Sequence, residues 1–286
     1  MMRYRASLVI SLLFAALGYR HDVRAFLADP ATSKHKPIHL SVASSSPNTE
    51  SVSSSSSTPF DFFQPTEIDA SNIPPNYQTI LTSLQELKSG SDLRGTYAAH
   101  ANSGGTIANI SHLVKKLKEE GKGAALTPFA SHCFGVAFAR WLLQHQDHLD
   151  NTTRDHKQGN ALTLCIGRDP RSHGERLADA FARGAESVDG LTRPVRVMYT
   201  GVATTPAMYE FVRSGKCDAA IMVTASHLPE DKNGIKFFVS NGGLDKNEID
   251  ELIVLAQDEA RHWYDMGIMP PSSGNAGVFC SELVSL

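Results

Sequence analysis

Short apolar runs separate longer segments with helical periodicity through most of the chain. The runs are Ala161–Ile166, Val195–Tyr199, Ala219–Val223 and Ile235–Val239. Each is followed by polar or glycine residues. The run Ala219–Val223 is unbroken, which is typical of a strand buried on both faces of a sheet, and the other three runs, with one polar residue each, are also strand-like. The pattern therefore predicts a central sheet with strands at these positions.

Between the runs, apolar residues recur at the three- and four-residue spacing of amphipathic helices. Thr127 followed by Pro128 is typical of a helix start, and Ser172 with Glu175 has the spacing of a capping box. The predicted helices lie at Gln78–Leu87, Ile107–Glu120, Thr127 to about Leu143, the segment after Ser172, the segment after Thr205, and Lys246–Tyr264. Strands that alternate with helices imply right-handed crossovers. We therefore expect an α/β fold, a three-layer α/β/α domain with a mainly parallel sheet over about residues 85–265, and a divergent tail at 266–286.

The first 75 residues have a composition unlike that of the domain. Arg3 and Arg5 precede the apolar run Ala6–Leu17, so residues 1–25 look like a signal peptide. Residues 26–75 are rich in serine and are expected to be a disordered transit or linker segment. The two in series resemble the bipartite plastid-targeting leaders of algae. We expect a plastid destination with no stable membrane anchor after cleavage; the alternative is the secretory pathway.

Composition narrows the possible functions. The chain has 286 residues, a net charge of −3 and 41% hydrophobic residues, and its basic residues do not cluster with aromatic residues. A nucleic-acid partner is therefore not expected. The cysteines Cys133, Cys165, Cys217 and Cys280 show no C-x-x-C pair, which favours buried free thiols over disulfides or a metal site.

Ser226 is the most informative candidate for chemistry. It follows the predicted strand Ala219–Val223, and open α/β sheets bind ligands beyond the carboxyl ends of their strands. A serine hydroxyl at that place can accept and donate a phosphoryl group if cations neutralise the charge, and Arg94, Arg168, Arg171 and Lys236 are candidates. A serine hydrolase is less favoured, because the G-x-S-x-G motif is absent. An inert surface serine is the remaining alternative.

Four sequence blocks in order resemble the α-D-phosphohexomutases, the phosphoglucomutase and phosphomannomutase family. They are Gly90–Gly95, Gly167–Arg171, Ala203–Pro206 and Thr224–Lys236. The resemblance covers the first domain of that family. Most members have asparagine where Leu228 stands here, and leucine at this position is similar to plant and algal plastid-type members.

The resemblance implies a role for each matched residue. Ser226 would carry the phosphoryl group, with His227 shaping its loop and Lys236 assisting the transfer. Arg94, Arg168 and Asn233 would bind phosphate or substrate. A phosphate oxygen on Ser226 would contact Mg²⁺, although the family's acidic metal loop does not occur in these 286 residues. The implied partners are hexose phosphate and hexose bisphosphate, and the implied reaction is intramolecular phosphoryl transfer. Because the chain holds only part of the family's site, we expect it to be truncated and to show no mutase turnover alone. The alternative is a non-catalytic module that binds or senses hexose phosphates.

Overall fold

A computed structural model describes residues 74–99, 107–145, 148–149, 161–188, 193–267 and 270. All the described residues belong to one compact unit. Residues 1–73 of the predicted leader, the tail after residue 270 and Cys280 lie outside the described residues, whereas Pro74 and Pro75, expected in the leader, are the N-cap and first residue of a helix. None of the described helices is both long enough and apolar enough to span a membrane.

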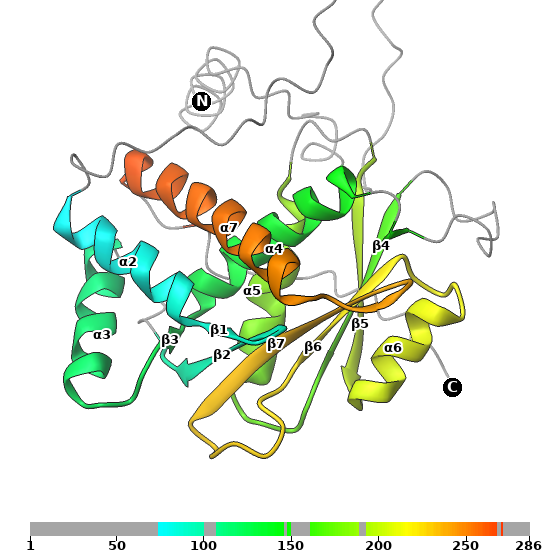
Figure 1. The fold of residues 1–286 in the computed structure, drawn as a ribbon, viewed down its shortest axis with the longest axis horizontal. Coiled ribbons are helices and arrows are strands. Elements are labelled where there is room, and N and C mark those ends of the chain that lie inside the picture. The colour runs from blue at the N-terminus through cyan, green and yellow to red at the C-terminus, as the bar shows by residue number, and fades with distance from the viewer. Residues whose placement is uncertain are drawn as a thin grey trace, which may run out of the picture. The chain divides into compact units, whose positions relative to one another are not determined.

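One mixed sheet forms the centre of the fold, with the strand order β1-β2-β7-β6-β4-β5 (Figure 1). Both β2 and β6 run antiparallel to β7, whereas β4 pairs in parallel with β5 and β6. Four of the five longer strands therefore point the same way, and β7 opposes them. The strands are β1 (Lys88–Ser89), β2 (Asp92–Tyr97), β3 (Ala125–Leu126), β4 (Leu162–Arg168), β5 (Val195–Val202), β6 (Ala219–Val223), β7 (Lys232–Val239) and β8 (Gly242–Gly243).

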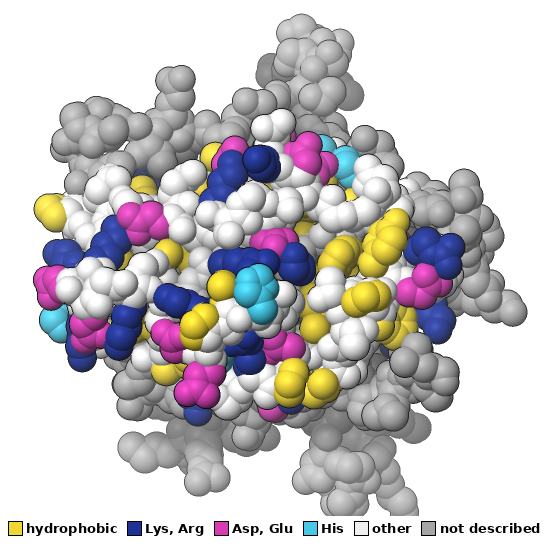
Figure 2. Space-filling view, turned by 60° about the horizontal axis from the view of Figure 1, so that its bottom comes forward, with side chains coloured by type: hydrophobic (Ala, Val, Ile, Leu, Met, Phe, Trp, Pro, Cys, Tyr) yellow, Lys and Arg dark blue, Asp and Glu magenta, His cyan; other side chains and the backbone are white. Residues whose placement is uncertain are grey.

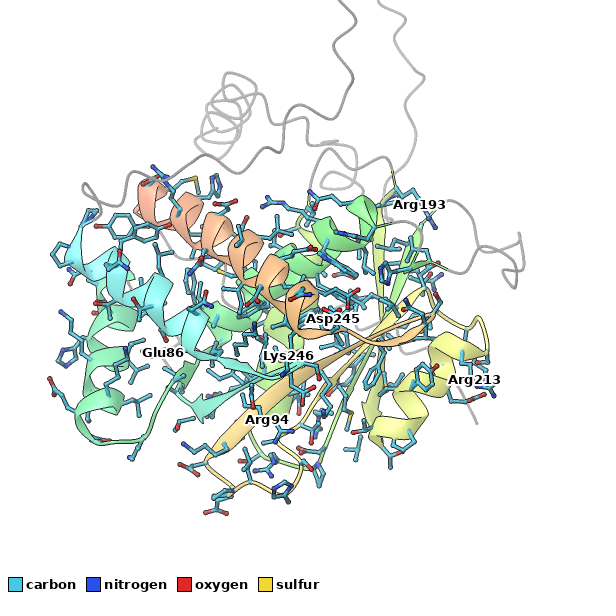
Figure 3. All side chains as sticks on the ribbon, viewed as in Figure 1. Glu86, Arg94, Arg193, Arg213, Asp245 and Lys246 are labelled. Carbon is cyan, nitrogen blue, oxygen red and sulfur yellow. The ribbon has the colours of Figure 1, made fainter. Side chains whose placement is uncertain are left out.

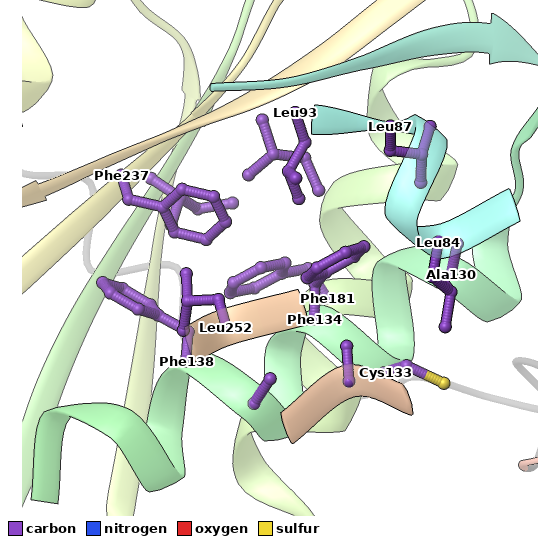
Figure 4. Packing of buried hydrophobic residues seen from close by; sticks show 14 of the residues in the cluster. Leu84, Leu87, Leu93, Ala130, Cys133, Phe134, Phe138, Phe181, Phe237 and Leu252 are labelled. Carbon is purple, nitrogen blue, oxygen red and sulfur yellow. The ribbon is translucent and has the colours of Figure 1, made fainter. Parts of the chain in front are cut away.

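The helices cover the two faces of this sheet unequally. The described helices are α2 (Pro75–Glu86), α3 (Ile107–Glu119), α4 (Pro128–Gln144), α5 (Gly174–Glu186), α6 (Thr205–Arg213) and α7 (Lys246–Met266). Side chains of α2, α4, α5 and α7 share the large core with one face of the sheet, where Phe138, Phe181 and Phe237 meet (Figure 4). Only α6 packs on the opposite face, through a small cluster that includes Met208 and Met222. The three-layer α/β/α architecture expected from the sequence is confirmed.

Successive residues of β6 and β7 alternate between these two faces. Val223 and Ile235 are paired across the strands and belong to the large core. Met222 and Lys236 are the next pair, so they project to the α6 face, because cross-strand partners share one face. Lys236 therefore stands on the more open side of the sheet.

Three local expectations differ from the structure. The predicted capping box at Ser172 does not form, because α5 begins at Gly174 with His173 as its N-cap and no side-chain cap. Arg94 lies within strand β2, a segment for which the sequence pattern predicted no strand. Helix α2, expected in part before residue 85, buries Tyr77, Ile80 and Leu84, so the packed unit begins before that residue. The three described cysteines are buried and free, as expected.

Candidate functional site

The connection between β6 and β7, residues 224–231, carries Ser226 at the carboxyl end of the sheet, and we call it the serine loop. It lies at the bottom of Figure 1, and Figure 2 turns this end toward the viewer and shows Lys and Arg side chains gathered near its middle. Ser226 and His227 are both exposed. Ser226 Oγ lies 3.4 Å from His227 Nδ1, and the described part of the chain gives Oγ no other hydrogen-bond partner. The hydroxyl is therefore open to a ligand from solvent.

Ser226 has a strained backbone conformation. Its φ of 58° makes it the one non-glycine residue with a positive φ among the described residues. The left-handed region costs an L-residue about 1–2 kcal/mol, so neighbouring contacts must hold the serine there. Strain of this kind is concentrated at functional sites in proteins.

A series of hydrogen bonds through Thr224 to Asp169 holds the strained serine in place. The Ser226 N–H donates to Thr224 Oγ1 at 3.0 Å, and the Thr224 hydroxyl donates to Asp169 Oδ2 at 2.8 Å. Asp169 also forms an ion pair with Arg171 at 3.1 Å, and the Arg171 guanidinium donates to the carbonyl of Ser226 at 3.1 Å. The serine is thus fixed on both sides by the segment that follows β4.

Lys236 and Arg94 meet on one carboxylate. Lys236 Nζ lies 2.5 Å and Arg94 Nη2 lies 3.1 Å from the same oxygen of Asp92. One negative charge thus faces two cations, and the cluster keeps a net positive charge. Such a surplus favours a nearby anion.

Gly234 lets Arg94 approach the serine loop. Arg94 lies opposite Gly234 in the β2–β7 pairing, and the Thr224 N–H bonds to the Gly234 carbonyl on the other side of β7. A Cβ on Gly234 would stand 2.4 Å from the Leu93 carbonyl oxygen, 2.8 Å from the Thr224 carbonyl oxygen and 3.2 Å from Arg94 Cγ. The side chain of Arg94, labelled beside β7 in Figure 3, therefore passes over bare backbone. Glycine within a strand often marks such an approach.

Two other predicted residues make contacts of their own. Arg168 donates to the Tyr199 hydroxyl at 2.6 Å and pairs with Glu175 at 3.5 Å. Burial raises the pKa of Tyr199, and the Arg168 hydrogen bond offsets part of that rise. Asn233 is fully buried and bonds His173 at 2.9 Å. Among the predicted site residues, the structure thus brings Arg94 and Lys236 together on Asp92, and Ser226 next to His227. Arg168 and Asn233 instead contact residues outside the predicted set.

Sequence reasoning missed Asp92 and the supporting roles of Thr224 and Asp169. All three lie in the quoted sequence blocks, but the signal that marks them is three-dimensional, because their partners come from other strands. Among the described residues, no group of three or more His, Cys, Asp or Glu side chains could hold a metal ion.

Asp92→Asn tests the carboxylate that neutralises Lys236 and Arg94. Because the change leaves two partly buried cations side by side, we expect the free energy of unfolding in urea to fall by about 1–3 kcal/mol. We also expect added sulfate to raise the melting temperature of the variant more than that of the parent. Asp250→Asn, which removes the exposed partner of Lys88, is the control and should cost less than about 0.5 kcal/mol. Equal urea midpoints for Asp92→Asn and the parent would contradict this account.

Comparisons with known proteins point to one family. The family described as phosphoglucomutase/phosphomannomutase, alpha/beta/alpha domain I, matches residues 118–261, about half of the chain. The match includes the serine loop and Lys236 but begins after Arg94.

Among curated proteins, phosphoglucosamine mutase of Lactobacillus delbrueckii subsp. bulgaricus is 37% identical over 110 residues, which are 37% of this chain and 23% of that protein. Phosphoglucosamine mutase of Pediococcus pentosaceus is 35% identical over 133 residues, 46% of this chain and 26% of that protein. The chain thus spans about a quarter of the length of these relatives. The crystal structure of a phosphoglucomutase/phosphomannomutase family protein from Burkholderia thailandensis aligns with a TM-score of 0.41 and 22% identity, over 62% of this chain and 30% of that one. By the match over residues 118–261, the chain belongs to the phosphoglucomutase/phosphomannomutase family, in the part that forms alpha/beta/alpha domain I.

Proposed function

We propose that this chain supplies the phosphoserine of a phosphohexomutase. The observation that carries the proposal is Ser226 itself, an exposed serine held in a left-handed conformation at the carboxyl end of β6. Two cations share one carboxylate in the neighbouring strands. Phosphoryl transfer depends mainly on positioning and on positive charge near the transferred oxygens, and this arrangement offers both.

In the proposed half-reaction, Ser226 Oγ attacks a phosphorus atom of a hexose bisphosphate. The bond from Oγ to phosphorus forms, and the bond from phosphorus to the sugar oxygen breaks. The serine proton leaves through a nearby base, with His227 Nδ1 within 3.4 Å, and a proton reaches the sugar oxygen. The products are a hexose monophosphate and phosphoserine, and the reverse step returns the group to a different sugar oxygen.

The proposed substrates are phosphates of glucose, mannose or glucosamine. The first two come from the family description and the third from the names of the curated relatives. Mg²⁺ is proposed to contact a phosphate oxygen on Ser226, with its other ligands outside the described residues. A plastid or secretory destination also stays a proposal, since it rests on the first 75 residues.

Phosphorylation of Ser226 tests the proposal. The 286-residue protein is incubated with glucose 1,6-bisphosphate and Mg²⁺, and intact-mass and peptide mass spectrometry are recorded. We expect one added phosphoryl group on Ser226 and none in Ser226→Ala, because the hydroxyl is the acceptor. Ser214→Ala is the control, since that hydroxyl on α6 bonds the carbonyl of its own helix turn.

Labelling of another serine in Ser226→Ala, to the extent seen in the parent, would refute the assignment. Tight binding of glucose 6-phosphate without any labelling would favour the alternative, a non-catalytic module.

A further inference from the structure

Arg171 makes an unusual set of contacts with the serine loop. Its guanidinium donates to three backbone carbonyls of the β6–β7 connection and to that of the first residue of β7. The four are those of Ser226 at 3.1 Å, Leu228 at 2.8 Å, Pro229 at 2.6 Å and Lys232 at 3.1 Å. The Arg171 side chain is only 14% exposed and is itself held by Asp169. Almost every N–H group of this guanidinium therefore donates either to the serine loop or to Asp169.

Two neighbouring groups complete the same pattern. His173 Nε2 lies 2.8 Å from the Glu230 carbonyl, and the Tyr97 N–H donates to the Asp231 carbonyl at 2.8 Å. The Asn233 side-chain oxygen accepts the Gly234 N–H, so its amide nitrogen faces His173 Nδ1. His173 Nδ1 must then accept, which leaves Nε2 to carry the proton that it donates. The carbonyls of Ser226 and of residues 228–232 therefore all accept hydrogen bonds from Arg171, His173 or the Tyr97 N–H.

These contacts have an electrostatic consequence for an incoming phosphate. Carbonyl oxygens carry partial negative charge and repel a dianion, and a loop with unpaired carbonyls could turn them toward it. Arg171 draws four of them to its own side and neutralises them. It also fixes the carbonyl of the residue whose backbone is strained, Ser226.

We infer that Arg171 is the positioning residue of the serine loop: it holds the loop carbonyls away from the phosphate and keeps Ser226 in its left-handed conformation. Arg171 does not touch the transferred group, because its donors are already used. This inference rests on the proposed function for the chemistry that it supports, but the shape of the loop can be tested without that chemistry.

Arginine is the side chain suited to bonding several backbone carbonyls at once. Its planar guanidinium presents five N–H donors in a fixed fork, whereas a lysine ammonium is a point charge with three. Arg171→Lys keeps the charge and loses most of the carbonyl contacts. It therefore separates the geometry of the guanidinium from its charge.

The experiment compares the 286-residue parent with Arg171→Lys and Arg171→Ala. Amide hydrogen exchange is followed over residues 224–232, and Ser226 labelling is followed with glucose 1,6-bisphosphate and Mg²⁺. In Arg171→Lys we expect a cooperative thermal transition, at least tenfold faster exchange in this segment, and at least tenfold slower labelling. In Arg171→Ala, millimolar guanidinium chloride should restore part of the labelling rate, and potassium chloride at the same ionic strength should not. Arg213→Lys on α6, an exposed arginine paired with Glu210, is the control and should match the parent.

Parent-like exchange in Arg171→Lys would overturn the inference. So would loss of cooperative unfolding in both variants, since Arg171 would then be a residue of the fold as a whole. If the parent itself is not labelled, the proposed function fails, and the exchange measurement still decides whether Arg171 positions the loop.

Discussion

Gly184→Ala is expected to destabilise the domain by at least about 3 kcal/mol. Helices α4 and α5 pack with their backbones in close approach, and a Cβ at Gly184 would overlap the carbonyl oxygen of His132 on α4. Gly135 on α4 makes the reciprocal approach to the Phe181 carbonyl on α5. A backbone atom cannot rotate away as a side chain can, so the helices must separate and lose packing in the main core. Urea unfolding followed by circular dichroism measures the loss.

Gly174→Ala is the control in the same helix. A Cβ there would first meet the flexible Arg168 side chain at 3.4 Å, so the unfolding midpoint should change little. Parent-like stability of Gly184→Ala would show that the two helices do not approach as described.

Much of the sheet could be predicted because β4 and β6 are buried on both faces, and because β7 alternates between buried and half-buried residues. The run Ala219–Val223 became β6 with the same bounds, and the run Ile235–Val239 became the second half of β7. Burial on both faces leaves no polar position within β6, so the sequence shows the strand directly. The serine loop could be placed for the same reason, since it follows that strand.

Strand β2 could not be predicted, because its sequence does not look like that of a buried strand. Asp92, Arg94 and Gly95 occupy it, and the charged residues are tolerated because Asp92 pairs both with Arg94 and with Lys236 from the neighbouring strand. Local propensity disfavours aspartate and glycine in strands. Tertiary contacts decided the outcome here.

The role of Arg171 could not be predicted from the sequence, for a different reason. Its side chain donates hydrogen bonds to main-chain carbonyls 55 to 61 residues later in the chain. Every residue has such a carbonyl, so the amino-acid sequence does not show which of them an arginine bonds. Sequence reasoning placed Arg171 near the site. Only the structure shows which atoms it holds.

Helix α4 also contains a buried titratable group, His132, which is 5% exposed. Its ring meets Trp263 of α7 edge-on, and its Nε2 has no hydrogen-bond partner within the described residues. Burial, with a smaller contribution from the charge of Arg183, lowers the pKa of His132 from 6.5 to about 4. The folded domain therefore keeps this imidazole neutral over a pH range in which the unfolded chain protonates it.

The domain should accordingly lose stability as the pH falls from about 6.5 to about 4. In that range the unfolded chain binds a proton that the folded chain does not, so each step down in pH favours unfolding. A difference of about 2.5 pH units corresponds to about 3 kcal/mol at the acid end. Urea unfolding midpoints at pH 7.5, 6, 5 and 4.5 measure this loss. His132→Leu should flatten the slope, whereas His262→Gln, which removes an exposed histidine of α7, should keep it. If the leucine variant lost as much stability over this range as the parent, the acid sensitivity would belong to other groups.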